Sequence, residues 1–314
     1  MSNYRYIPFM RYRHYAAGIS GVLVLFSLIS LAVNGLNFGL DFTGGTQIEL
    51  FFDKPPVLEN IRNDLTEGGF PNHEVVFVGT DQDVLVRVQN GSGSDDAVFD
   101  AGEIAQQVLL LLSSETGTPP QFLGSEFISS QVGDELKEQG GLGMLVALGM
   151  IMIYIALRFQ FKFSVGAVVS LVHDTILTLG FFSITGLNFD LTVLAAVLAV
   201  IGYSLNDTIV VADRIRENFR VMRGIEPAQV IDIAITQTMA RSIITSLTTL
   251  LVLVALFFFG GDVVHGFSMA LIVGIFFGTT SSIYVAASIL MYLNISKEDL
   301  MPPVKDQEEL DAIP

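Results

Sequence analysis

Long apolar runs separated by short polar stretches dominate the chain. Runs of this kind predict membrane-spanning helices where they reach about 20 residues, the length that crosses a bilayer. Hydropathy and helix-breaking residues place six of them at 15–36, 140–158, 163–186, 190–212, 241–260 and 266–292. The first is long and lacks a small-residue cleavage site, so we expect a retained anchor and not a signal peptide. The pattern predicts a polytopic α-helical membrane protein.

The segment 37–139 interrupts this pattern and predicts one small soluble domain. Alternating apolar and polar residues are typical of strands, and amphipathic periodicity is typical of helices. The predicted order is strand, helix, strand, strand, helix, strand, at 46–52, 59–67, 75–78, 84–89, 100–112 and 121–127. A loop is expected at 90–96. This order suits a ferredoxin-like α+β sandwich.

Charge orients the predicted bundle of helices. If the six helices alternate, the basic loop residues gather on one side, which the positive-inside rule makes cytoplasmic. These residues are Arg5, Arg11, Arg13, Arg158, Lys162, Arg214, Arg216, Arg220 and Arg223. We therefore expect both termini, a cytoplasmic loop at 213–240 and an acidic tail at 294–314 inside. The first helix then lies within 1–36, a five-helix bundle within 140–293, and the domain 37–139 is periplasmic.

Composition narrows the function classes. Apolar residues make up 51% of the chain and charged residues only 15%, which agrees with a membrane protein. The domain 37–139 holds 18 acidic residues against four basic ones and most of the net charge of −16. That surface either keeps the domain soluble or binds basic segments of a client, and it disfavours nucleic acid as a partner.

Candidate chemistry for an enzyme or a metal site is missing from the sequence. Cysteine is absent, so no disulfide, zinc–thiolate site or thioester lipid anchor is expected. The four histidines are scattered without metal-ligand spacing, and no ATP-binding P-loop motif occurs. Neither a catalytic nucleophile–base pair nor a cofactor can be assigned from the residues.

One carboxylate stands deep inside an apolar run. Asp207 follows Asn206 in GYSLNDTIVVADRIREN at 202–218. An acid in a spanning helix costs at least a few kcal/mol unless it has a partner. Helical spacing puts Tyr203, Ser204 and Asp207 on one face, which must look into the bundle. We expect a proton or ion relay or a charge switch there; the alternative is a structural aspartate satisfied by neighbouring hydroxyls.

Two further groups extend this candidate site. Arg241 begins the fifth predicted helix on the cytoplasmic side and is the expected partner of Asp207, because a nearby arginine favours an ionised carboxylate. Its alternative role is a membrane anchor whose charge reaches the headgroups. His173 and Asp174 lie near mid-membrane, about 15 Å into the third helix. They suggest either a second relay station or a hydrogen bond between helices.

Three short motifs have structural or mechanical interpretations. Gly44 and Gly45 follow Asp41 in FGLDFTGGT, where they form either a hinge for the soluble domain or a simple exit from helix to strand. The spacing of Gly274 and Gly278 predicts close helix packing. Asp213 and Arg214 begin a charged cytoplasmic motif that is more typical of a solvated face than of a site.

These motifs together resemble the SecF family of protein-export membrane subunits, within the resistance-nodulation-division group. The resembling segments are FGLDFTGGT at 38–46, LVHDTILTLGFFSITG at 171–186, GYSLNDTIVVADRIREN at 202–218, TSLTTLLVLVALFFFGG at 245–261 and GIFFGTTSSIYVA at 274–286. The resemblance covers nearly the whole chain, although the soluble domain matches more by position than by motif. Ala212 is one departure, because the family usually has Phe there.

The resemblance implies a function. Members of the family pair with SecD and assist the SecYEG channel in the bacterial cytoplasmic membrane, using proton motive force to draw preproteins across. YajC and YidC are further partners to consider. By analogy, Asp207 and Arg241 fall on positions of the proton path. A small-molecule proton antiporter of the same group and a scaffold for membrane-protein assembly are the alternatives; the choice between protons and sodium ions is open.

Overall fold

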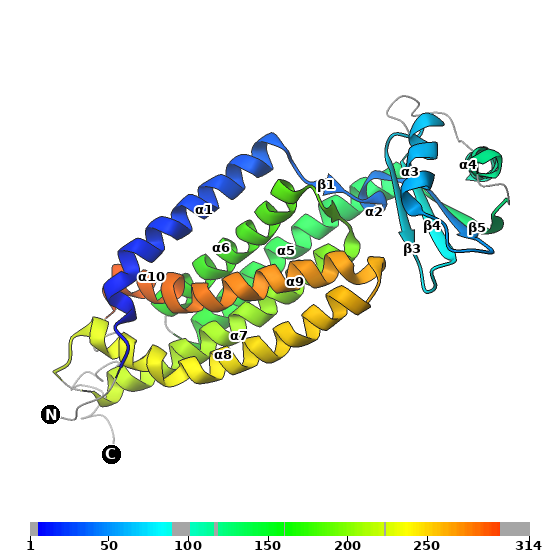
Figure 1. Ribbon diagram of the computed structural model, residues 1–314. Helices are drawn as coiled ribbons and strands as arrows, with labels where there is room; N and C mark the ends of the chain where they lie inside the picture. The colour runs from blue at the N-terminus through cyan, green and yellow to red at the C-terminus, as the bar shows by residue number, and fades with distance from the viewer. Residues whose placement is uncertain (1–5, 90–100, 116–118, 160, 223, 296–314) are drawn as a thin grey trace, which may run out of the picture.

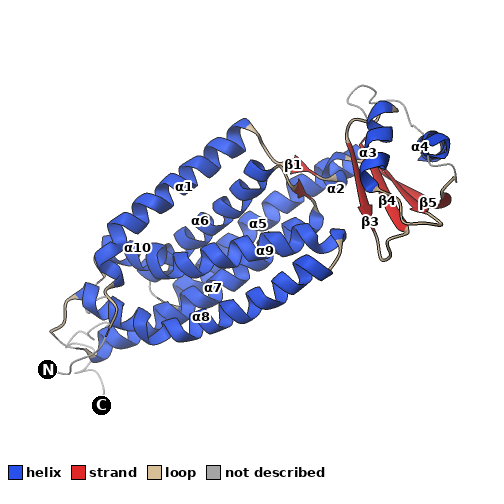
Figure 2. Cartoon of the chain, viewed as in Figure 1, coloured by secondary structure: helices blue, strands red, loops and turns tan. Residues whose placement is uncertain are grey.

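The computed structural model describes residues 6–89, 101–115, 119–159, 161–222 and 224–295. These residues form a bundle of long helices with a small α+β domain at one end (Figures 1 and 2). Within these described ranges, six helical segments are long and apolar enough to span a membrane: Phe9–Val33, Gln131–Arg158, Phe161–Thr185, Leu191–Val221, Pro227–Phe259 and Val263–Tyr292. The predicted polytopic fold with six spanning helices is therefore confirmed.

The helices of the bundle begin and end at recognisable signals. Asp190 caps the first turn of its helix by accepting a hydrogen bond from the backbone of Val193 at 2.8 Å, and Pro227 opens the next helix, where its missing N–H costs nothing. The elements are η1 (Phe9–Tyr12), α1 (Arg13–Val33), α5 (Ser130–Arg158), α6 (Phe161–Thr185), α7 (Leu191–Val221), α8 (Pro227–Phe259), α9 (Asp262–Ser281), the π-helical η2 (Ser282–Ala286) and α10 (Ala287–Tyr292).

Three helices extend beyond the spans that hydropathy predicts. The expected cytoplasmic loop at 213–240 is mostly helical, because α7 continues to Val221 and α8 begins at Pro227. Apolar residues on the facing sides of these extensions bury one another, with Ile215 and Ile231 almost fully inaccessible. Helix α5 begins at Ser130, so the end of the segment assigned to the soluble domain belongs to a spanning helix. Hydropathy alone marks only the lipid-facing length of such helices.

The soluble domain has the ferredoxin-like topology that its element order predicted. Its elements are β2 (Gly45–Phe51), α3 (Leu58–Glu67), β3 (His73–Phe77), β4 (Asp83–Gln89), α4 (Ala101–Glu115) and β5 (Gln121–Ile128). The sheet order is β3-β4-β2-β5 with every neighbouring pair antiparallel. Ile48 and Val86 of the sheet pack against Ile61 and Val108 of the two helices. The loop expected at 90–96 lies outside the described residues.

A short junction connects this domain to the bundle. It consists of β1 (Asn37–Phe38), which pairs in parallel with β6 (Asn188–Phe189), and the one-turn helix α2 (Leu40–Thr43). Phe42 and Phe189 stack with ring centroids 5.9 Å apart and lie in one cluster with Phe182. The junction is therefore packed onto the ends of α6 and α7 and does not hang free.

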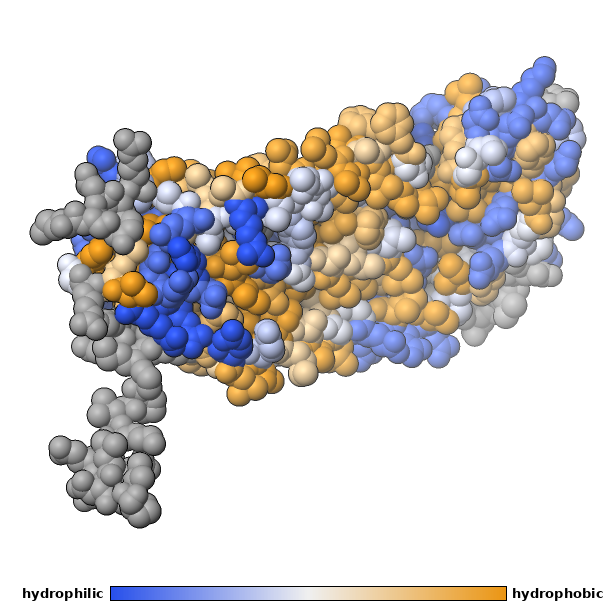
Figure 3. All heavy atoms as spheres, turned by 90° about the horizontal axis from the view of Figure 1, so that it is seen from below, coloured by the Kyte–Doolittle hydropathy of each residue, from blue (hydrophilic) through white to orange (hydrophobic). Residues whose placement is uncertain are grey.

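The surface agrees with a membrane-embedded bundle. Apolar residues cover the middle of the bundle on the face shown in Figure 3, whereas hydrophilic residues gather toward its two ends. Large apolar side chains such as Leu145, Leu157 and Phe258 are exposed along the helices. An apolar belt of this kind is stable in lipid and would aggregate in water.

Candidate functional site

Polar side chains are concentrated in the interior of the helical bundle. The described part of the chain buries Ser170, Asp174, Ser204, Asp207, Thr208, Ser242, Ser281 and Ser282 between helices. Burying a polar group costs free energy unless it is hydrogen-bonded, and burying a charge costs more. The hydrogen-bond partners of the two buried carboxylates, Asp174 and Asp207, therefore mark the candidate functional site of the bundle.

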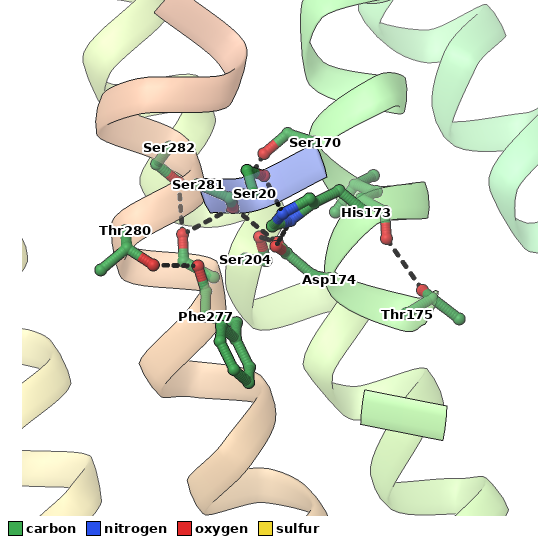
Figure 4. Close-up of polar contacts among 12 residues, drawn as sticks. Ser20, Ser170, His173, Asp174, Thr175, Ser204, Phe277, Thr280, Ser281 and Ser282 are labelled. Atoms are coloured by element: carbon green, nitrogen blue, oxygen red, sulfur yellow. Dashed lines mark hydrogen bonds and ion pairs between the residues drawn. The ribbon is translucent and has the colours of Figure 1, made fainter. Parts of the chain in front are cut away.

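Asp174 is the better satisfied of the two acids. It is 1% exposed, and its Oδ2 accepts hydrogen bonds from the hydroxyls of Ser204 at 2.6 Å and Ser281 at 2.8 Å. Its Oδ1 lies 2.9 Å from Nδ1 of His173 (Figure 4). The carboxylate thus joins α6 to α7 and α9 and has a partner on each oxygen.

His173 carries this network to a further helix. Its Nε2 lies 2.5 Å from the hydroxyl of Ser20 on α1, and Figure 4 shows the imidazole between Ser20 and Asp174. The hydroxyl of Ser170 also donates to Ser281 at 2.9 Å, a second bond between α6 and α9. Together with the bonds of Ser20 and Ser204, the network spans α1, α6, α7 and α9. The sequence suggested either a relay station or a hydrogen bond between helices here, and the geometry supplies contacts for both.

The order Ser20, His173, Asp174 resembles a hydrolase triad in its hydrogen bonds. A nucleophilic serine also needs donors placed to stabilise an oxyanion. Ser20 lies inside α1, where the backbone N–H groups are already used by the helix. The arrangement is a chain of hydrogen bonds and gives no support for acyl transfer.

Asp207 has a different environment. It is 7% exposed, and its Oδ1 accepts a hydrogen bond from the hydroxyl of Ser242 on α8. Its Oδ2 is buried and has no hydrogen-bond partner within the described residues. The next residue, Thr208, shares a hydrogen bond of 2.9 Å with Ser282, between α7 and the π-helical turn η2. The carboxylate is thus only half satisfied.

The expected pair between Asp207 and Arg241 is not formed in this structure. Arg241 is exposed and makes no ion pair with Asp207, although both residues are described. Successive residues point about 100° apart around a helix, and it is Ser242 that faces the carboxylate. On α7, the same step of about 100° between neighbouring residues turns Asn206 away from the polar interior, and its side chain is exposed.

Tyr203 and Ser204 diverge from Asp207 despite their shared helical face. The hydroxyl of Ser204 donates to Asp174, and that of Tyr203 lies 3.4 Å from Thr249 on α8. Ser20, Ser242, Ser281 and Ser282 were missed, because hydroxyl residues are common in spanning helices and their spacing does not show which of them faces a carboxylate.

Gly274 and Gly278 let α9 approach α7 closely. A Cβ atom at Gly274 would collide with the side chain of Val200. A Cβ at Gly278 would lie 3.1 Å from the hydroxyl oxygen of Ser204, beside Asp174. The packing role predicted from the spacing agrees with this geometry, and it places Gly278 directly against the polar site.

The predicted hinge residues lie where the junction enters the sheet. Gly44 has φ +74° and Gly45 has φ +147°, both in the region that favours glycine. The carboxylate of Asp41 accepts a hydrogen bond of 3.1 Å from the backbone of Leu191, in the first turn of α7. The chain is therefore held on α7 up to Asp41 and turns into β2 at the two glycines.

The charged motif after Asp207 lies at the other end of α7. Arg214 donates to the side chain of Gln237 on α8 at 2.7 Å and also bonds Glu217, and Asn218 donates to the same Gln237 oxygen at 2.9 Å. Asp213 is exposed. These contacts fasten α7 to α8 and do not form a pocket.

Comparison with known proteins gives a consistent family. Residues 111–296 match the description "Protein export membrane protein SecD/SecF, C-terminal", and residues 29–56 match "SecD/SecF GG Motif". The chain is similar to "Protein translocase subunit SecF" of Pseudomonas aeruginosa, with 48% identity over 95% of this chain and 94% of the relative. The SecF of Vibrio alginolyticus is 47% identical over 98% of this chain and 97% of the relative.

Solved structures agree with the sequence relatives. The crystal structure of SecDF from Thermus thermophilus, described as a translocon-associated membrane protein, superposes with a TM-score of 0.77 and 36% identity over 92% of this chain. A SecDF structure in a super-membrane-facing form gives a TM-score of 0.71 and 34% identity over 98% of this chain. The chain spans only 39% and 40% of those two longer chains.

Proposed function

We propose that this chain, which belongs to the SecD/SecF family of protein export membrane proteins, couples proton motive force to protein translocation. It is an accessory subunit of the SecD–SecF type and a multi-pass bacterial membrane protein. Our proposal concerns the coupling to protons and the residues that perform it. Asp207 is the principal carrier, and Asp174 with His173 forms a second station.

The observation that carries the proposal is the half-satisfied carboxylate of Asp207. A buried oxygen without a hydrogen-bond partner costs about 1–3 kcal/mol. A second state in which this oxygen has a partner is therefore stabilised relative to the state seen here. That state is reached when the carboxyl group binds a proton or when Arg241 swings inward from the surface. Either change alters the contact between α7 and α8, on which Ser242 lies.

Helix α7 can carry such a change to the soluble domain. About 16 residues, or roughly 24 Å of helix, separate Asp207 from Leu191. Leu191 bonds the carboxylate of Asp41, and the amide of Gly39 donates to Phe189 at 2.9 Å, just before α7. A shift of α7 therefore pulls on the junction that ends at Gly44. A polar cavity of about 210 Å³, lined in part by Asn37, Glu74, Arg87 and Asn188, lies beside this junction and leaves room for movement.

The proposed setting follows from the family and the charge distribution. SecD is the partner, and SecYEG and the translocating preprotein are the machinery and cargo, with YajC and YidC as further proposed partners. The bilayer is the bacterial cytoplasmic membrane, with the domain at 37–139 periplasmic and both termini cytoplasmic. Helix α1 starts and α10 ends at the end of the bundle away from the domain (Figure 1), which fits that orientation.

The test is preprotein export into membrane vesicles with and without an imposed proton gradient. Asp207→Asn keeps the size of the side chain and removes its titration. We expect normal insertion and SecD binding but no stimulation by the gradient, while Asp213→Asn, on an exposed residue of the same helix, responds like wild type. A full gradient response from Asp207→Asn would refute the carrier role. A wild-type chain without any response would favour the scaffold alternative.

A further inference from the structure

We infer that the proton bound at the second station lies on Nε2 of His173, with Ser20 as its hydrogen-bond switch and Asp174 remaining ionised throughout. This inference deepens the proposed proton coupling and rests on it. It differs from a simple carboxylate relay, because the titrating atom is a histidine nitrogen that faces α1 and not the carboxylate at the centre of the bundle.

The hydrogen bonds around Asp174 identify which atoms can hold a proton. Oδ2 accepts from the hydroxyls of Ser204 and Ser281, and Ser281 in turn accepts from Ser170. Two donors converge on Oδ2, so a proton placed there would displace one of them. Oδ1 faces Nδ1 of His173 at 2.9 Å. This contact is a hydrogen bond only if a proton lies between the two atoms, and Nδ1–H donating to Oδ1 satisfies both.

With Nδ1 protonated, the remaining choice concerns Nε2. In the neutral imidazole, Nε2 is an acceptor and the hydroxyl of Ser20 donates to it. In the imidazolium, Nε2–H donates and the oxygen of Ser20 accepts. The contact of 2.5 Å between Ser20 and Nε2 serves both states, because a hydroxyl can reverse its role by rotation. One proton from water is added to Nε2, and no other bond changes.

His173 is less deeply buried in the bundle than Asp174 is. Asp174 is 1% exposed, whereas the side chain of His173 is 10% exposed and that of Ser20 is half-buried. Protonation turns a buried net charge of −1 into a neutral imidazolium–carboxylate pair, which a low-dielectric interior tolerates better than an isolated charge.

The groups that face this pair are hydroxyls rather than charges. Within the described residues, α1, α7 and α9 present Ser20, Ser204 and Ser281 to it. The nearest further acid along α7 is Asp207, one turn beyond Ser204. The other titratable or basic groups described on the elements packed against α6 are Arg13, His14 and Tyr15 of α1, Asp134, Glu135, Lys137, Glu138, Tyr154 and Arg158 of α5, Tyr203, Asp213, Arg214, Arg216, Glu217 and Arg220 of α7, His265 of α9, Tyr284 of η2 and Tyr292 of α10. Of the carboxylates on α7, Asp207 is the one nearest to this pair along the helix.

The test is a nitrogen-15 NMR titration of histidine-labelled protein, purified with its SecD partner in lipid nanodiscs. The resonances absent from His173→Gln identify His173. Between about pH 8 and pH 5, where histidine changes charge, we expect Nδ1 to stay protonated and Nε2 to become protonated. Ser20→Ala should shift the midpoint of that change. Ser30→Ala should not, since Ser30 bonds Ser183 across the same two helices at 2.8 Å.

Two results would overturn the inference. One is an Nε2 that keeps the same protonation across this range; the other is an Nδ1 that loses its proton while Asp174 gains one. Asp174→Asn provides the counter-test, because removing the negative charge should abolish the low-pH imidazolium. The titration does not depend on export, so an intact titration with gradient-independent export would refute the proposed function and leave the proton site standing.

Discussion

Asp207 accepts a hydrogen bond from Ser242 through one carboxylate oxygen and buries the other without a partner in the described chain. Asp174, on α6 of the same bundle, has hydrogen-bond partners on both carboxylate oxygens. The two acids are therefore suited to different tasks. A fully bonded acid holds helices together and supports a neighbouring titratable group, whereas a half-bonded acid can exchange its partner when the helices move.

Removing the Ser242 hydroxyl should destabilise the bundle through Asp207. Ser242→Ala leaves both oxygens of a buried carboxylate without a donor, which costs about 1–3 kcal/mol. We expect a lower thermal midpoint of the purified SecD complex. In the Asp207→Asn background the same substitution should cost less, because no charge is left unpaired. Equal effects of Ser242→Ala in both backgrounds would show that the two side chains are not coupled.

Arg241 should matter for coupling and little for stability. It is exposed and unpaired with Asp207 in this structure, so Arg241→Gln should change the thermal midpoint by no more than a typical surface substitution, within about 0.5 kcal/mol. If an inward Arg241 completes the working cycle, the variant should lose gradient-stimulated export, and Arg241→Lys should restore part of it. Arg220→Gln is the matched control, an exposed arginine on α7. Unchanged coupling in Arg241→Gln would assign Arg241 to membrane anchoring.

Any side chain that replaces Gly278 should disturb the hydrogen bonds around Asp174. The Cβ of Gly278→Ala would lie 3.1 Å from the Ser204 oxygen and press it away from Asp174. Overpacking of this kind typically costs 1–3 kcal/mol. Gly202→Ala on α7 meets nothing within 4 Å and should stabilise its helix slightly. Thermal unfolding of the two variants provides the comparison, and similar midpoints would argue against close packing at Gly278.

The junction should depend on Gly45 for its shape and on Asp41 for its attachment. Gly45→Ala forces a side chain into φ +147° and against the carbonyl of Val88, so we expect a loss of a few kcal/mol and a loosened sheet. Gly124→Ala in β5 has open space and is the control. Asp41→Asn should leave the domain folded and weaken its tie to α7. Limited proteolysis of the full chain separates the two effects: Gly45→Ala exposes sites in the domain, and Asp41→Asn exposes sites in the junction.

The orientation in the membrane can be measured directly. A reporter that is active only in the periplasm should work when inserted after Gly79, in the turn between β3 and β4, and should be silent after Gly224, between α7 and α8. Both positions lie in exposed turns, so the insertions should be tolerated. The opposite pattern would place the domain in the cytoplasm and contradict the proposed role in export.

The sequence by itself determined the six spans, the βαββαβ order of the domain and the presence of buried acids at 174 and 207. These features depend on local patterns, because apolar length, strand alternation and an acid in an apolar run can all be recognised within one segment. The sequence also marked 274 and 278 as packing positions, since glycine spacing is itself a local signal.

Only the tertiary structure decided which partners the acids have. Whether Arg241 or Ser242 faces Asp207 depends on the rotation of α8 about its axis, and one residue of rotation, about 100°, exchanges an ion pair for a hydroxyl. Ser204 reaches Asp174 and not Asp207 because α6 and α9 meet α7 at that height, where Gly278 leaves room. Such contacts arise between residues far apart in the chain, so no pattern within one helix can fix them.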